Sequence, residues 1–166
     1  MLELAPWNET SFAILEACNS PGMTEHLGGP ESPEKLADRF QRYLGYVGED
    51  SEAWAFRLLL DGVGIGSLGY WRDEDAYEIG WAVIPEYQGR GLARAGVELV
   101  IDDAVRRGGF TTMIAHPAVT NLASNALAKS AGFTLIGEEQ IEYPKGTFVQ
   151  ANRWSYDLAK RQGRAD

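Results

Sequence analysis

The sequence has little cysteine, no long hydrophobic run, and few basic residues for its acidic content. Cys18 is the only cysteine among 166 residues, so an internal disulfide is excluded and a reducing compartment, the cytoplasm, is expected. No apolar run approaches the roughly 20 residues needed to cross a bilayer. The N-terminal stretch MLELAPWNET has neither a basic segment nor a long apolar one, so no secretory signal is expected there.

The shortage of basic residues gives the chain a strongly negative charge. Fifteen lysines and arginines stand against 24 acidic residues, which gives a formal net charge of −9. Such a surface repels nucleic acid and anionic membranes, so neither is expected as a partner. It favours a cationic small molecule or a basic peptide end, although solubility alone also explains an acidic composition.

The rest of the composition is typical of one globular domain, residues 1–166. Hydrophobic residues make up 45% and charged residues 23% of the chain, which is long enough to bury a sizeable core. Periodicity predicts helices at 8–19, 32–47, 90–107 and 122–131, and strands at 53–60, 64–71, 76–84, 111–115, 134–141 and 148–157. A loop is expected at 20–32 and a frayed tail at 160–166. This order predicts an α+β fold in which helices pack against a mixed sheet.

Two glycine-rich stretches compete as binding motifs, and the first is rejected. Residues 64–69, GIGSLG, match the GxGxxG pattern of dinucleotide sites letter for letter. That pattern needs a strand before it and a helix after it, so that the helix N-terminus faces a pyrophosphate. Here the stretch is itself strand-like. We interpret it as a hairpin strand whose small residues permit close packing.

The second stretch, YQGRGLA at residues 87–93, follows a strand and a proline and leads directly into a helix. Free N–H groups at a helix N-terminus form an anion-binding cradle, which the helix dipole strengthens. Gly89 and Gly91 would let a phosphate-bearing ligand approach the backbone, and Arg90 would add positive charge. From these residues alone, this interpretation and an ordinary tight turn before a helix are equally open.

Four motifs in order resemble one family. Residues 88–93, Q-x-x-G-x-A, resemble the acyl-CoA signature Q/R-x-x-G-x-G/A of the GNAT superfamily of N-acyltransferases, and NLASNALAKSAGF resembles its last helix. HLGGPESPEKLADRF and YEIGWAVIPEYQGRG resemble the RimJ/RimL branch. The resemblance covers roughly residues 10 to 157. It implies the GNAT fold, a mixed, mostly antiparallel twisted sheet of about six to seven strands with helices on both faces.

The resemblance also implies an activity and a cofactor site. It implies an N-acetyltransferase that uses acetyl-CoA as co-substrate, needs no metal, and transfers acetyl directly to a primary amine of a small molecule or a protein N-terminus. Val83 would offer its main-chain N–H to the thioester oxygen where the sheet splays beside a bulge. Asn121 would bond the pantetheine arm, a role that can coexist with capping its helix. The implied cofactor-binding residues are Val83, Gln88, Gly89, Arg90, Gly91, Leu92, Ala93 and Asn121.

Direct transfer needs a base for the amine and a donor for the departing thiolate. Glu78 is the candidate base, with a solvated strand-end glutamate as the alternative, and His116 is the reserve base. Many GNAT enzymes carry a tyrosine acid where this chain has Ala128, which cannot donate. The RimJ/RimL branch usually carries a serine one turn earlier, so the resemblance implies Ser124 as the candidate donor, with a plain helix serine as the alternative. The expected catalytic residues are Glu78, Ser124 and Asn121.

Other interpretations stay open at this point. A non-catalytic acyl-CoA sensor on the same fold would bind CoA without turnover. A nucleotide-binding oxidoreductase would need an acidic ribose partner about 20 residues past the glycine loop, and FTTMIAHPA offers none. Either a monomer or a homodimer is compatible with the sequence. Four tryptophans could line an acceptor pocket but are assigned no role, because strand aromatics more often belong to the core: Trp7, Trp54, Trp71 and Trp81.

Overall fold

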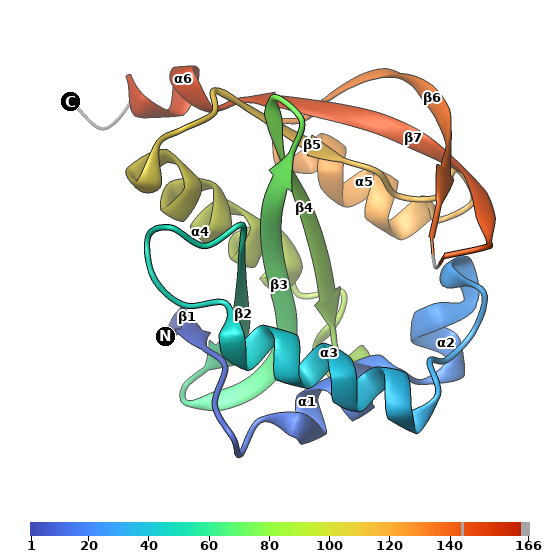
Figure 1. Cartoon of the computed structure of the whole chain (residues 1–166). Coiled ribbons are helices and arrows are strands. Elements are labelled where there is room, and N and C mark those ends of the chain that lie inside the picture. Colours follow the sequence, from blue (N-terminus) through green and yellow to red (C-terminus); the bar gives the residue numbers. More distant parts are fainter. Residues whose placement is uncertain (144, 164–166) are drawn as a thin grey trace.

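The computed structural model describes residues 1–143 and 145–163 and contains one seven-stranded sheet in the order β1-β2-β3-β4-β5-β7-β6 (Figure 1). All neighbouring strands are antiparallel except the parallel pair β4–β5. The strands are β1 (Leu2–Pro6), β2 (Ala53–Leu60), β3 (Val63–Asp73), β4 (Ala76–Val83), β5 (Thr112–Ala115), β6 (Thr134–Glu142) and β7 (Phe148–Asp157). The predicted mixed, mostly antiparallel sheet is confirmed.

Six α-helices and two short 3-10 turns complete the described chain. The helices are α1 (Phe12–Cys18), α2 (Pro21–Thr24), α3 (Pro33–Gly45), α4 (Leu92–Arg107), α5 (Leu122–Ser130) and α6 (Leu158–Gln162), and the turns are η1 (Glu25–Leu27) and η2 (Pro85–Tyr87). The predicted start of α3 is confirmed, because Ser32 Oγ accepts from Lys35 N–H at 3.3 Å. The predicted turn of the β2–β3 hairpin is confirmed at Asp61 and Gly62, which both have positive φ, 50° and 82°.

Several local predictions were wrong. The first helix begins at Phe12 rather than at residue 8, and β1 was missed. The predicted loop at 20–32 contains α2 and η1, because Ser20 caps a helical turn that starts with Pro21. The tail predicted to fray from Lys160 continues α6 to Gln162, whose start Asp157 caps by accepting from Ala159 N–H at 3.0 Å. The rest of that tail, residues 164–166, lies outside the described residues.

Helices cover both faces of the sheet, and neighbouring residues of β2 show how. Successive side chains of a strand point to opposite faces. Trp54 belongs to the main core that α4 covers, whereas Ala55 belongs, with Leu36 and Phe40 of α3, to a second buried cluster that also includes α1. The arrangement agrees with the helices on both faces that the family resemblance implies.

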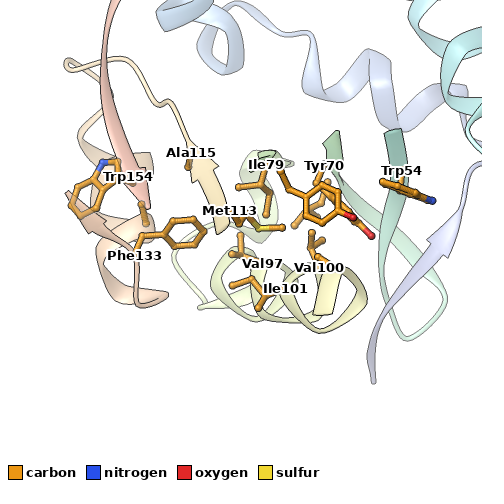
Figure 2. Close-up of a cluster of buried hydrophobic side chains, with 14 of the residues drawn as sticks. Trp54, Tyr70, Ile79, Val97, Val100, Ile101, Met113, Ala115, Phe133 and Trp154 are labelled. Carbon is orange, nitrogen blue, oxygen red and sulfur yellow. The ribbon is translucent and has the colours of Figure 1, made fainter. Parts of the chain in front are cut away.

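The main core fixes α4 against the sheet (Figure 2). Val97, Val100 and Ile101 of α4 are fully buried against side chains of β3, β4 and β5, among them Tyr70 and Met113. Burying each such side chain contributes about 1.5–3 kcal/mol. The N-terminus of α4 is therefore held in place by packing along the rest of the helix.

The rejected GxGxxG stretch lies inside β3, as interpreted, and its glycines permit close strand contacts. A Cβ added at Gly66 would collide with the carbonyl oxygen of Ala82 on β4. One added at Gly69 would lie 2.9 Å from the carbonyl oxygen of Trp54 on β2. Small residues here serve strand packing, and no helix follows to face a phosphate.

The parallel strands β4 and β5 separate soon after they meet. They pair at Tyr77↔Met113 and Glu78↔Ile114 only, while β4 continues to Val83. Ile84 N–H donates to Ile65 O at 2.9 Å, toward β3. Because N–H groups alternate along a strand, the N–H of Val83 faces the opposite, open edge. The expected splay is present, but the expected bulge near Val83 is not, since the β3–β4 register runs without a shift to Gly66↔Val83.

Candidate active site

A cleft of about 1740 Å³ opens where β4 and β5 separate. Its walls come from the end of β4, the following loop, the first turns of α4 and α5, the α1–α3 segment, and the β6–β7 hairpin. Pockets for one small ligand measure about 300–1,000 Å³. The cleft is therefore large enough for two ligands side by side, or for one ligand as large as a coenzyme together with an acceptor.

Glycines shape the loop at the mouth of α4. Gly89 and Gly91 have positive φ, 71° and 75°, and a Cβ added at either would point into open space. The first helical hydrogen bond of α4 runs from Ala95 N–H to Gly91 O. The N–H groups of residues 92–94 precede it and are directed out of the helix end. The loop thus has the geometry of an anion-binding cradle.

Side chains tie this loop to β4, and one predicted member lies apart. Gln88 Nε2 donates to Val83 O at 2.8 Å, which fixes the loop against the strand end. Five residues of the loop and the following helix line the cleft together with Val83: Gln88, Gly89, Gly91, Leu92 and Ala93. The exposed Arg90 is not part of the lining. Its guanidinium carbon lies 5.8 Å from the centre of the Tyr87 ring.

Asn121 and Ser124 lie together at the start of α5. Asn121 Oδ1 accepts from Ser124 N–H at 3.1 Å, so Asn121 caps the helix. Ser124 Oγ accepts from the indole Nε1 of Trp81 at 3.2 Å. Both residues line the cleft.

Asn125, which the sequence analysis missed, fixes α5 against the sheet. Its Oδ1 accepts from Asn152 Nδ2 and Trp154 Nε1, both at 2.8 Å. Its Nδ2 donates to Ala118 O at 3.0 Å and to Asn121 O at 2.8 Å. A half-buried amide with all these bonds is structural. Its sequence signal was hidden, because it reads as one more polar residue in the NLASN stretch.

The two candidate bases are bonded to each other. His116 Nδ1 and Glu78 Oε1 lie 3.0 Å apart, and both residues line the cleft. The His116 side chain is 6% exposed and that of Glu78 is 20% exposed. Burial alone lowers the pKa of His116, but hydrogen bonding and charge from Glu78, and then from Glu139, outweigh it and raise the pKa above its ordinary value of 6.5.

Two residues that the sequence analysis missed extend this pair. Glu139 of β6 bonds His116 Nε2, and Arg153 NH1 of β7 donates to Glu139 Oε1 at 3.1 Å. Burial raises the pKa of Glu139, but the bonds from Arg153 and His116 outweigh it and lower the pKa. In the sequence both residues are typical of solvent-exposed positions on a hairpin, so no local pattern pointed to them.

Of the four tryptophans considered for an acceptor pocket, Trp54, Trp71 and Trp81 line the cleft, and Trp7 lies in the second buried cluster. No helix in the described part of the chain is long and apolar enough to cross a membrane. Over residues 1–143 and 145–163, no group of three or more His, Cys, Asp or Glu side chains could hold a metal ion.

In this protein the sheet opens between β4 and β5 beside a helix N-terminus that two glycines shape. The family model described as an acetyltransferase (GNAT) domain matches residues 1–134, well over half of the chain. The protein therefore belongs to the GNAT acetyltransferases.

Solved structures share this fold at low sequence identity. An acetyltransferase from Salmonella typhimurium that modifies the N-terminal serine of the 50S ribosomal subunit protein L7/L12 has a TM-score of 0.78 and 22% identity, over 94% of each chain. The microcin C7 self-immunity acetyltransferase MccE, in complex with acetyl-CoA and AMP, has a TM-score of 0.79 and 17% identity, over 94% of this chain and 92% of its own. The aminoglycoside acetyltransferase AAC(6')-Ib with coenzyme A has a TM-score of 0.76 and 19% identity, over 98% and 99%.

Proposed function

We propose that this protein is an acetyl-CoA-dependent N-acetyltransferase of the RimJ/RimL-like branch, formed by one domain over residues 1–166. It transfers acetyl directly to the primary amine of a cationic small molecule or of a protein N-terminus. One observation carries the proposal: the open edge of β4, the N-terminus of α4 and the Glu78 carboxylate all face one cleft. Solved relatives that modify a protein N-terminus and aminoglycosides support an amine acceptor.

In this proposal the coenzyme lies between the end of β4 and α5. The N–H groups at the start of α4 bind its pyrophosphate, with help from the helix dipole. The N–H of Val83 polarises the thioester carbonyl, and Asn121 bonds the pantetheine arm. Arg90 lies on the same loop but outside the cleft lining, and we assign it a long-range contribution of positive charge to this site. The residues assigned to the coenzyme are Val83, Gln88, Gly89, Arg90, Gly91, Leu92, Ala93 and Asn121.

Residues on both sides of the cleft contribute to the proposed acetyl transfer. An amine is mostly protonated at neutral pH, so Glu78 takes one proton from its nitrogen. The nitrogen lone pair attacks the thioester carbonyl carbon, and the Val83 N–H stabilises the oxyanion. The carbonyl re-forms and the C–S bond breaks, which leaves the acetyl group on a nitrogen that still carries one extra proton. That proton passes to the departing thiolate, so the products are a neutral amide and the CoA thiol. Ser124 donates a hydrogen bond to the thiolate as negative charge develops on sulfur.

Direct transfer is favoured over an acetyl-cysteine intermediate. Cys18 is the only cysteine of the chain, and it also lines the cleft. Burial raises the pKa of its thiol to about 11. Because only the thiolate is a good nucleophile, Cys18 is almost entirely in its unreactive form at neutral pH.

The charge of the cleft favours a cationic acceptor. Seven carboxylates line it against four arginines, so its field attracts positive charge. Two of those arginines are already paired with carboxylates of the lining, Arg39 with Glu31 and Arg153 with Glu139. The carboxylates are Glu25, Glu31, Asp73, Glu74, Glu78, Glu139 and Glu142, and the arginines are Arg39, Arg42, Arg94 and Arg153.

Two measurements test the proposed function. A thermal-shift screen with acetyl-CoA, NAD and ATP should show stabilisation by acetyl-CoA alone. Thiol release should then be followed with an aminoglycoside, a peptide with a free N-terminal serine, and a neutral amine. Turnover with a cationic amine is expected. Stabilisation by acetyl-CoA without turnover on any amine would instead indicate the acyl-CoA sensor, and stabilisation by NAD would contradict both.

A further inference from the structure

Four side chains of alternating charge form a row across the splayed part of the sheet. Glu78 comes from β4, Glu139 from β6 and Arg153 from β7, and His116 directly follows the last residue of β5. Consecutive members are in hydrogen-bond contact: Glu78 with His116 at 3.0 Å, His116 with Glu139, and Glu139 with Arg153 at 3.1 Å. The row therefore connects strands that lie on opposite sides of the cleft.

The contacts decide the protonation of His116. Each of its ring nitrogens faces a carboxylate oxygen, Nδ1 toward Glu78 and Nε2 toward Glu139. A neutral imidazole donates from only one nitrogen, so one of the two contacts would bring a lone pair against a carboxylate. The imidazolium donates to both. Arg153 NH1 lies 3.5 Å from His116 Nε2 but 3.1 Å from Glu139 Oε1. The two nitrogens are neighbours because both donate to the same Glu139 oxygen.

The burial of the row decides which member can move. The His116 side chain is 6% exposed, whereas Glu139 and Arg153 are 39% and 37% exposed. A ring held at both nitrogens cannot turn without losing a charge-assisted bond. Its Nδ1 therefore holds Oε1 of Glu78 and leaves the other oxygen of that carboxylate for a ligand in the cleft.

We propose that Glu139 and Arg153 are positioning residues for acetyl transfer: they hold His116 as a donor to Glu78 and so orient the carboxylate that accepts the proton of the amine. This inference rests on the proposed function. It assigns His116 to orientation rather than to proton abstraction, because both of its nitrogens are already donors.

The row has a pH dependence with a definite sign. The groups that face His116 are Glu78 from β4, Glu139 from β6 and Arg153 from β7. The pKa of His116 is raised above its ordinary value of about 6.5. Its proton therefore stays bound just above pH 6.5 and is lost as the pH rises through the raised pKa of the folded protein. Activity should therefore fall on the alkaline side of its profile. Glu139→Gln should move that fall to lower pH, because one of the two carboxylates that hold the proton is gone.

An NMR titration tests the row without any activity. The chain has two histidines, so the imidazole signals of His116 and His26 are separated with a His26→Gln variant. The pKa of His116 should lie above 6.5 and should fall in Glu139→Gln. Glu138→Gln is the matched control, because this exposed neighbour on β6 is not part of the cleft lining. An unchanged His116 pKa in Glu139→Gln, or an equal fall in Glu138→Gln, would overturn the proposal.

Kinetics separate positioning from a merely structural role. By analogy with the carboxylates that orient metal-binding histidines, Glu139→Gln should lower kcat by about 10- to 100-fold. The KM for acetyl-CoA should stay unchanged, and Arg153→Lys should retain more activity than Arg153→Gln. A wild-type kcat and pH profile in Glu139→Gln would overturn this inference while leaving the proposed function intact. No transfer by the wild type to any amine would overturn the proposed function, and the catalytic role of the row with it.

Discussion

The indole Nε1 of Trp81 donates to the Oγ of Ser124 across 3.2 Å, from β4 to α5. This bond occupies a lone pair of the serine oxygen, so the hydroxyl hydrogen is left to donate to another group. Ser124 and Trp81 both line the cleft. The pair therefore orients a hydroxyl donor on the wall where we propose that the coenzyme lies.

Ser124→Ala should lower kcat and leave acetyl-CoA affinity nearly intact. A hydrogen bond to a charged group contributes about 1–3 kcal/mol, which corresponds to roughly a 5- to 150-fold loss of rate. Trp81→Phe should give a smaller loss, because it removes only the bond that orients the hydroxyl. kcat and the acetyl-CoA Kd are measured side by side. If Ser124→Ala leaves both kcat and Kd unchanged, water donates the hydrogen bond to the thiolate. If kcat is unchanged but the acetyl-CoA Kd is raised, Ser124 is a binding contact.

Glu78→Gln keeps the size of the side chain and removes the base. A loss of about 10²- to 10⁴-fold in kcat is expected, with partial recovery at high pH, where more of the amine is already unprotonated. The control is Glu86→Gln, which removes an exposed carboxylate of η2 that is not part of the cleft lining. If Glu78→Gln and Glu86→Gln have similar kcat values, Glu78 is a solvated strand-end residue.

Gly91→Ala should weaken acetyl-CoA binding beyond its effect on folding. Gly91 has φ 75°, and its added Cβ would point into the space that we assign to the pyrophosphate. Gly62, in the β2–β3 turn, has φ 82° and equally open surroundings but is not part of the cleft lining. Each substitution should cost about 1–2 kcal/mol of stability through left-handed strain.

Only Gly91→Ala should also raise the acetyl-CoA Kd, by about tenfold or more, equivalent to at least about 1.4 kcal/mol. Denaturant unfolding measures the stability, and calorimetry measures the Kd. Equal Kd values for Gly91→Ala and Gly62→Ala would place the pyrophosphate site elsewhere.

Salt should weaken binding of the acceptor. The Debye length shortens from about 10 Å at 0.1 M to about 3 Å at 1 M ionic strength, so the attraction of the acidic cleft for a cation is screened. The KM for a cationic amine should rise over this range, whereas the KM for a neutral amine serves as the internal control. A salt-independent KM, or a neutral amine as best substrate, would contradict a cationic acceptor.

Sequence by itself determined those features that depend on residues close together in the chain. The Asp61-Gly62 turn, the Ser32 cap of α3 and the glycine loop before α4 each involve residues within about one helical turn of each other, where local sterics and hydrogen bonds decide the conformation. The same kind of signal, Ser20 followed by Pro21, marked α2 and was overlooked amid the surrounding glycines and prolines. Most of the elements, and the candidate coenzyme loop, could therefore be predicted.

Tertiary structure alone decided which strands pair and which side chains on different strands are in contact. The short β1 is defined by its pairing with β2, for example Leu4 with Leu58, and its own five residues gave too weak a pattern. His116 meets Glu78 and Glu139 across 38 and 23 residues of chain. The face on which Glu139 lies depends on the β6–β7 register, which shifts between Leu135 and Gly137. A slip of one residue would turn the side chain to the other face of the sheet, and only the packed sheet determines that register.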